Sequence, residues 1–247
     1  MIFLINFHPT YIRTKYWHLK QCIYNYFRYF CTFENVTLFT MDKSLFYSFV
    51  TDNTETINVI RNAAWKLHES VNQTYDGSLP YGYHLSMVAD FVMKYGYEVI
   101  ADVDDILPLI FGAYFHDSIE DARITYNDLS RFALKFFDSR QANIAVEIVY
   151  ALTNDKGRTR EERAGEKYYN GIRQTPYAPF VKLCDRFANI SYSCSANSEN
   201  GRRMKYVYQN EWNHFIEAIS THIEENDIRM KLSPEIINEI ETIFKDI

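Results

Sequence analysis

Histidines, carboxylates and an amide occur in four short stretches of this sequence, at positions that could together bind a divalent metal ion. The stretches are PYGYH at 80–84, HDSIED at 116–121, KLCDR at 182–186, and Asn189. A histidine on one helix, a His-Asp pair on the next and an aspartate on a later apolar helix could complete a set of two histidines and two aspartates. Imidazole and carboxylate ligands suit Mn²⁺, Fe²⁺ or another divalent first-row metal better than a metal that prefers thiolates.

The His116-Asp117 pair lies near the end of an apolar stretch, ILPLIFGAYFHD. Polar side chains at the edge of a buried face cost stability unless they are paired or bind something. Glu120 and Asp121 follow at the i+4 positions. If the helix continues through the motif, we expect both acids to lie one turn further along the same two faces.

The charge around this pair also favours a bound cation, because residues 95–122 contain no Lys or Arg. They contain seven acids: Glu98, Asp102, Asp104, Asp105, Asp117, Glu120 and Asp121. Such a cluster repels itself unless a cation or solvent screens it.

Each stretch also has a structural interpretation when it is taken alone. A single histidine such as His84 is more often structural than a ligand, and a His-Asp dipeptide is common by chance. Asp185 could be an ordinary helix residue in a salt bridge. The occurrence of all the stretches in this order, on helices, favours a metal site over separate structural roles.

The order His…His-Asp…Asp resembles the signature of the HD-domain metal-dependent phosphohydrolases. The finer detail resembles the hydrolase domain of the RelA/SpoT group, including the small stand-alone alarmone hydrolases and their metazoan homologues. The resemblance covers roughly residues 55–220. It is carried by AAWKLH (63–68), PYGYH (80–84), HDSIEDARITYNDL (116–129), ALTNDK (151–156) and VKLCDRFANI (181–190).

The resemblance implies a role for each polar residue of the motifs. The implied ligands of one Mn²⁺ ion are His84, His116, Asp117 and Asp185. Glu120 and Asp121 would position or activate the attacking water, and Asn189 would contact the nucleotide. The reaction of the family removes the 3′-pyrophosphate from guanosine tetraphosphate and pentaphosphate, the alarmones of the stringent response.

The sequence departs from the family at positions that concern the substrate rather than the metal. Gln73 and Thr74 stand where the family usually has an Arg-Lys pair that helps to hold the nucleotide, and Leu85 replaces a proline. After Asn189, Ser191 and Tyr192 stand where the family often has Arg and Thr. Metal-dependent hydrolysis is therefore better supported than alarmone specificity.

Other residues could bind a phosphate-rich substrate. Lys182 and Arg186 flank Asp185 and are the closest candidates. Residues 156–173 contain six basic side chains, which could hold a polyphosphate through bidentate Arg contacts or form a solvated helix face with i,i+4 pairs: Lys156, Arg158, Arg160, Arg163, Lys167 and Arg173. Tyr81, Tyr83 and Tyr192 could stack on a base or could simply pack within the protein.

The rest of the pattern predicts helices to position these residues. Apolar spacings and capping signals predict them over 54–72, 82–95, 104–117, 125–136, 141–152, 159–173, 178–195, 202–224 and 234–246. The stretch YDGSLP at 75–80 is predicted to be a loop. Because no convincing strand pattern occurs, we expect an all-α fold, an HD-domain helical bundle with the metal site in its core cleft.

Composition limits the class of protein. The chain has 247 residues, of which 47% are hydrophobic, and a formal net charge of −6. These values argue against a disordered or low-complexity protein and against stable binding to nucleic acids. Four cysteines without a CxxC pair predict a reducing, cytoplasmic location. We expect neither a signal peptide nor a membrane span.

The first 52 residues are predicted to be an aromatic-rich extension, with the phosphohydrolase domain over 53–247. Residues 1–40 include twelve Phe, Tyr or Trp residues and have a net charge of +3, against −9 for the remainder. They could form an arm that binds a membrane surface or a partner. Alternatively, they are a gene-start artefact and translation begins at Met41.

These observations lead us to expect a Mn²⁺-dependent phosphohydrolase with a nucleotide substrate, most simply a stand-alone alarmone 3′-pyrophosphohydrolase. The alternatives are an HD-family phosphatase acting on another nucleotide, such as NADPH or a 3′- or 5′-nucleotide, and a nucleotide-binding regulator without turnover. The oligomeric state cannot be predicted from the sequence.

Overall fold

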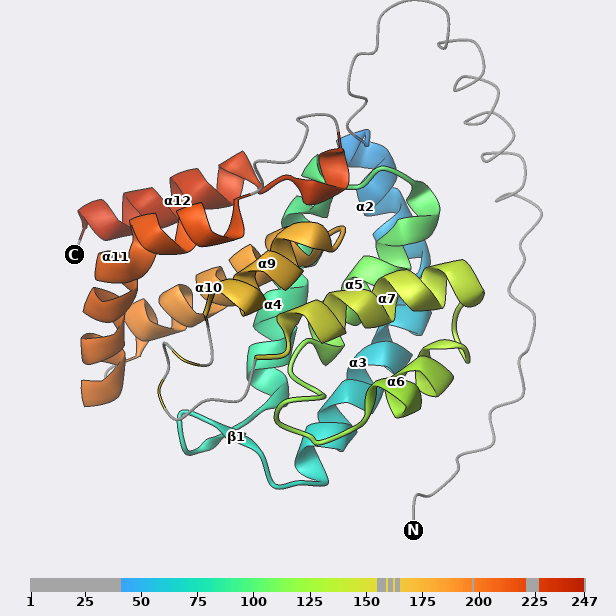
Figure 1. Ribbon diagram of the computed structural model, residues 1–247, viewed down its shortest axis with the longest axis horizontal. Helices are drawn as coiled ribbons and strands as arrows, with labels where there is room; N and C mark the ends of the chain where they lie inside the picture. The colour runs from blue at the N-terminus through green and yellow to red at the C-terminus, as the bar shows by residue number, and fades with distance from the viewer. Residues whose placement is uncertain are drawn as a thin grey trace, which may run out of the picture. The chain divides into compact units, whose positions relative to one another are not determined.

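The computed structural model describes residues 41–154, 159, 162, 165–196, 198–220 and 227–246. Within them the chain is mostly helical, with ten α-helices and one short antiparallel hairpin (Figure 1). The helices are α2 (Lys43–Asp52), α3 (Thr54–Glu69), α4 (Gly82–Tyr95), α5 (Ile106–Phe115), α6 (Tyr126–Ala133), α7 (Ser139–Leu152), α9 (Glu166–Gln174), α10 (Ala178–Ser195), α11 (Glu199–Ile219) and α12 (Pro234–Lys245). The hairpin pairs β1 (Thr74–Tyr75) with β2 (Leu79–Pro80), and 3₁₀ turns occur at η1 (Gly96–Glu98), η2 (Val103–Asp105) and η3 (Ile228–Met230).

The predicted helical class is confirmed for this part of the chain. The boundaries predicted for α4 and α10 are those observed, and α12 begins as predicted, with Ser233 as N-cap and Pro234 in the first turn. The helix predicted over 202–224 begins at Glu199 instead, because the Ser198 side chain accepts a hydrogen bond from the Gly201 N–H and caps it earlier. Residues 221–226 lie outside the described residues.

Helix α5 ends at Phe115, two residues before the predicted end, so the His-Asp motif begins just after the regular helix. The Ser118 N–H donates to the Phe115 carbonyl over 2.9 Å, an i→i+3 bond that tightens the chain into a turn. The motif therefore follows a series of turns rather than one continuous helix face.

Helix α2 lies within the predicted N-terminal extension, yet it packs against the rest of the described fold. Asp42 caps its first turn by accepting from the Leu45 N–H, and Phe46 and Phe49 are buried on one face. Residues 1–40, for which an arm or a gene-start artefact is predicted, lie outside the described residues.

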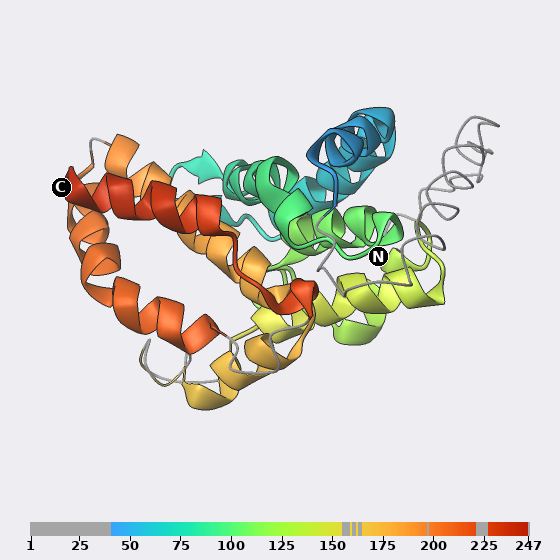
Figure 2. The same cartoon turned by 90° about the horizontal axis from the view of Figure 1, so that it is seen from above.

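The core lies around α4, α5 and α10. Helix α10 packs against α4 and α11, and α5 packs against α4 and α7; α11 and α12 cover the outer side of α10 (Figure 2). Gly112 allows the close approach of α5 to α7, because a Cβ atom there would lie 2.7 Å from Ile148 Cγ2. Burial of each large apolar side chain in such a core contributes about 1.5–3 kcal/mol.

A buried polar contact ties the beginnings of α5 and α10 together. The Tyr177 hydroxyl donates to Asp105 Oδ2 over 2.6 Å, and Arg140 Nη1 donates to Asp105 Oδ1 over 2.8 Å. Asp105 is 2% exposed, so its charge requires this pairing. Since α5 leads into the His-Asp motif and α10 carries Asp185, the contact helps to hold the site-bearing segments in register.

In the described part of the chain, no helix is both long enough and apolar enough to cross a membrane.

Candidate metal centre

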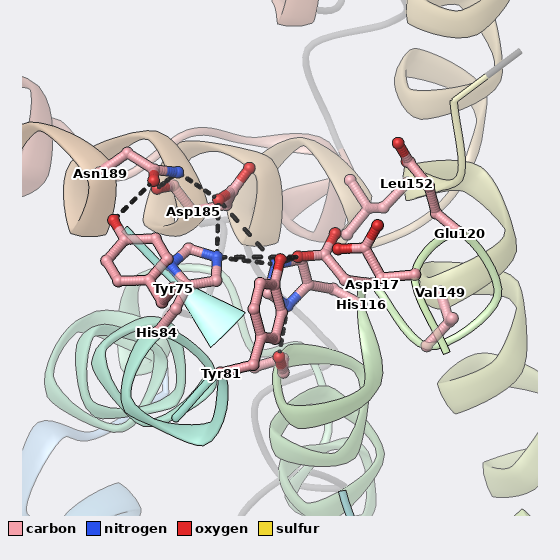
Figure 3. Close-up of polar contacts among 12 residues, drawn as sticks. Tyr75, Tyr81, His84, His116, Asp117, Glu120, Val149, Leu152, Asp185 and Asn189 are labelled. Atoms are coloured by element: carbon pink, nitrogen blue, oxygen red, sulfur yellow. Dashed lines mark hydrogen bonds and ion pairs between the residues drawn. The ribbon is translucent and has the colours of Figure 1, made fainter. Parts of the chain in front are cut away.

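Three of the predicted ligands form a compact, buried group at which a metal ion could bind (Figure 3). His84 lies on α4, and His116 and Asp117 directly follow α5. The Nε2 atoms of the two histidines are 3.3 Å apart, and Asp117 Oδ2 lies 2.9 Å from His116 Nε2 and 3.8 Å from His84 Nε2. Both histidines are 2% exposed. Residues that the sequence predicts to act together thus lie close together in space.

Asp185, the fourth predicted ligand, reaches the group from α10. Its Oδ1 atom lies 3.3 Å from His84 Nε2 and 3.9 Å from His116 Nε2. Its Oδ2 atom accepts from Lys182 Nζ over 2.9 Å, and its Oδ1 atom also accepts from Asn189 Nδ2 over 2.7 Å. Asp185 therefore borders the group, and its role as a ligand stays a prediction.

The spacing of these donor atoms fits a divalent cation. Ligand atoms about 2.1 Å from an ion lie about 3.0 Å apart at right angles and about 3.4 Å apart at tetrahedral angles. The distances among the His84, His116 and Asp117 donor atoms run from 2.9 to 3.8 Å. Two neutral imidazoles and a carboxylate are a donor set that first-row metals accept.

The orientation of His116 is set by its other ring nitrogen. Nδ1 lies 2.8 Å from the Ala113 carbonyl oxygen, which can only accept, so Nδ1–H donates to it. In the neutral ring, Nε2 then carries the lone pair that faces the group, as a metal ligand requires. Burial by itself would lower the pKa of His116, but the Asp117 carboxylate beside it raises that pKa to about 9. In the absence of a metal, a protonated His116 therefore supplies the positive charge beside the Asp117 carboxylate.

Tyr81 supports Asp117 from the opposite side. Its hydroxyl donates to Asp117 Oδ2 over 2.5 Å, and its ring stacks on that of His68 with the centroids 4.7 Å apart. Both ring nitrogens of the fully buried His68 lack a hydrogen-bond partner among the described residues. The sequence left base stacking and packing within the protein open for Tyr81; in the structure its ring packs on His68 and its hydroxyl orients a candidate ligand.

Glu120 and Asp121 face different surroundings. Asp121 Oδ2 accepts from Gln73 Nε2 over 3.1 Å, and burial together with the Asp117 charge raises the pKa of Asp121 to about 6. Glu120 is exposed and accepts from the Asn154 side chain over 3.1 Å and from its backbone N–H over 3.3 Å. In Figure 3 it points away from the two histidines, toward the end of α7. The two acids predicted to act together are therefore held by separate partners.

The predicted substrate-binding residues have protein partners. Asn189 accepts from the Tyr75 hydroxyl over 2.9 Å and donates to Asp185, as does Lys182. Arg186 Nη1 donates to Glu211 Oε2 over 2.9 Å, and its guanidinium lies over the Phe215 ring. Contacts of these three residues with a substrate stay predictions.

The second predicted source of positive charge is only partly described. Lys156, Arg158, Arg160 and Arg163 lie outside the described residues. Among the described residues, Arg173 donates to the Ala218 carbonyl over 2.6 Å and pairs with Glu166. That basic side chain is therefore used in packing α9 against the end of α11.

His68 should make the metal-free protein sensitive to acid. Burial lowers the pKa of His68 to about 4, whereas an unfolded histidine titrates near 6.5. Between these values the unfolded chain binds more protons, so the free energy of unfolding should fall as the pH drops from 6.5 towards 4. Urea unfolding in EDTA at pH 7.5 and 4.5 measures this fall in the free energy of unfolding. The fall should be about 2–3 kcal/mol smaller in His68→Gln than in the wild type. An equal fall in both proteins would show that His68 is not the cause of the acid sensitivity.

Comparison with known proteins adds no relative: the chain matches no protein-family model and no curated protein.

Proposed function

We propose that this chain is a metal-dependent phosphohydrolase of the HD-domain type, acting with Mn²⁺ on the 3′-pyrophosphate of guanosine tetraphosphate or pentaphosphate. The observation that carries the proposal is the buried group of His84, His116 and Asp117, whose donor atoms have the spacing of metal ligands. Asp185 at its border supplies the fourth ligand in this proposal.

The residues around the group suit such a reaction. A divalent ion held there would lower the pKa of a water molecule from 15.7 towards about 7 and polarise a phosphoryl oxygen. Tyr81 and the Ala113 carbonyl keep Asp117 and His116 oriented. In this proposal Asp121, whose backbone N–H donates to the Asp117 carbonyl over 2.8 Å, would accept a proton, and Glu120 would orient the water.

A second candidate substrate class is another nucleotide, such as NADPH or a 3′- or 5′-nucleotide. It is favoured by Gln73, which stands where the family resemblance places the arginine of an Arg-Lys pair. Here the uncharged Gln73 side chain donates to Asp121 instead of offering a positive charge to a phosphate. A substrate with fewer phosphate charges would need that pair less.

A hydrolysis screen tests the proposed function. Guanosine tetraphosphate, NADPH and ordinary nucleoside mono- and triphosphates should be incubated with the protein and Mn²⁺. We expect at least one to release phosphate or pyrophosphate, with activity lost in EDTA and restored by added Mn²⁺. Release from guanosine tetraphosphate supports the first substrate class, and faster release from NADPH supports the second. If the protein binds stoichiometric metal but hydrolyses none of these compounds, the proposed enzymatic function is contradicted. The alternative of a nucleotide-binding regulator would then remain.

A further inference from the structure

The segment that joins α3 to α4 forms a short hairpin beside the metal centre. Thr74 pairs with Pro80 and Tyr75 with Leu79, and the turn between them places Asp76 at φ +47° and Gly77 at φ +75°. Two successive residues with positive φ reverse the chain sharply. The side chains on either side of this turn can therefore point to different parts of the site.

Tyr75 covers one side of the metal centre. Its ring is stacked on the His84 imidazole, with the centroids 4.9 Å apart and the planes inclined by 15°. Its hydroxyl donates to Asn189 Oδ1 over 2.9 Å, and Figure 3 shows the ring lying alongside His84 with the hydroxyl at Asn189. The Tyr192 ring packs edge-on against Tyr75 at 4.8 Å. A protein side chain thus occupies the position beside Asn189.

Tyr75 leaves Asn189 little capacity for another partner. The Asn189 amide nitrogen donates to both the backbone carbonyl and the Oδ1 atom of Asp185, over 3.0 and 2.7 Å. The amide oxygen accepts from Tyr75. Since both N–H donors of the amide are taken by Asp185, a nucleotide can contact Asn189 only at the amide oxygen, where the Tyr75 hydroxyl already occupies one of the two lone pairs.

Asp76 fastens the tip of the hairpin to the junction between α10 and α11. Its carboxylate accepts from the Tyr192 hydroxyl over 2.8 Å, from Asn200 Nδ2 over 3.2 Å and from Ser198 Oγ over 3.5 Å. Asp76, Tyr192 and Asn200 are not buried, so water competes for these bonds and their net contribution is modest. Such a contact can open without disturbing the core.

The other end of the segment reaches the opposite side of the centre, where Gln73 donates to Asp121. Residues 73–80 therefore contact a candidate ligand, the residue predicted to bind the nucleotide and an acid predicted to act on the water. A chain segment in this position controls what can approach all three.

We propose that residues 73–80 form a lid over the metal centre, with Tyr75 as its gate and Asp76 as its latch. A nucleotide reaches Asn189 when the latch opens and Tyr75 leaves. The identity of that substrate rests on the proposed function, but the opening of the lid does not. If the open state is a small fraction of the molecules, the apparent KM equals the intrinsic value divided by that fraction.

Asp76→Ala tests the lid, with Asp52→Ala, an exposed aspartate on α2, as the matched control. Hydrogen–deuterium exchange should be measured over residues 73–81. Asp76→Ala removes three exposed hydrogen bonds of modest net strength, so exchange in this segment should speed up by about 5- to 10-fold. Exchange in α4 and α10 should not change. The control should match the wild type throughout.

The same variant links the lid to catalysis. For any nucleotide turned over with Mn²⁺, Asp76→Ala should lower KM by the factor by which exchange rises, with kcat unchanged, because Asp76 touches none of the predicted ligands or acids. Tyr192→Phe, which removes one donor to Asp76, should also speed exchange and lower KM, each by a smaller factor than Asp76→Ala does.

Two outcomes overturn the proposal. Unchanged exchange in both variants shows that Asp76 is not a latch, and faster exchange with an unchanged KM shows that the substrate does not pass the lid. Faster exchange in a protein that hydrolyses no nucleotide would support the lid and contradict the proposed function, so the two failures are distinguishable.

Discussion

Asp185→Ala is expected to lower the affinity for Mn²⁺ by more than about 100-fold, since even residues that only orient metal ligands change affinity by about 10- to 100-fold. The Asp185 Oδ1 atom lies 3.3 Å from His84 Nε2, on a side chain that is 13% exposed. Loss of the carboxylate removes one negative charge from a poorly solvated site, where water replaces it only in part. Metal content after dialysis and a Mn²⁺ titration measure the effect.

Asp185→Ala also removes the partner of Lys182, whose side chain is 19% exposed. A buried cation without a partner destabilises the fold, so thermal unfolding of the metal-free variant must be recorded. Asp185→Asn keeps the volume and the hydrogen-bonding oxygen and should lose metal to a similar degree. Asp90→Ala, an exposed position on α4, is the control and should bind metal as the wild type does. Wild-type affinity in both Asp185 variants would restrict the ligands to His84, His116 and Asp117.

The part of the site predicted from the sequence is the part placed by single helices. Helix α4 carries His84 and α10 carries Asp185 and Asn189, and both were predicted with the observed boundaries. Their apolar periodicity and end signals are local properties of the chain. The packing of α4 against α5 then brings His84 close to His116 and Asp117.

The part that could not be predicted depends on contacts between distant segments. Nothing near Tyr75 in the sequence indicates that it meets Asn189, because the contact requires both the hairpin turn and the packing of α4 against α10. The contact of Asn154 with Glu120 likewise joins the end of α7 to the His-Asp motif. Such pairings are decided by tertiary packing rather than by residue spacing.

Charge was also difficult to assign from the sequence alone. Lys182 and Arg186 are predicted to bind substrate because they flank Asp185, and their contacts with a substrate stay predictions. Lys182 lies three residues before Asp185 and shares its helix face, whereas Arg186 directly follows Asp185 and faces another direction. Lys182 turns to Asp185, while Arg186 turns to Glu211 on α11. Helix α2 was missed because it follows an aromatic-rich stretch in which no period persists, although Asp42 caps it and Phe46 and Phe49 are buried.

Glu120→Ala is expected to keep the metal and lose at least about 100-fold in kcat, the lower end of what a positioned acid or base contributes. Its carboxylate is exposed and is held by Asn154, outside the group of His84, His116 and Asp117. Removal should therefore leave metal content and thermal stability within error of the wild type. Glu69→Ala, an exposed glutamate at the end of α3, is the control and should keep full activity.

The companion variant Asn154→Ala separates the position of the Glu120 carboxylate from its presence. It removes the side-chain hydrogen bond to Glu120 but leaves the carboxylate and the backbone bond, so its kcat should fall by less than that of Glu120→Ala. Metal loss in Glu120→Ala equal to that in Asp185→Ala would make Glu120 a ligand. An unchanged kcat in Glu120→Ala would mean that Glu120 does not orient the water. Asp121, whose carboxylate accepts from Gln73, would then be assigned that role.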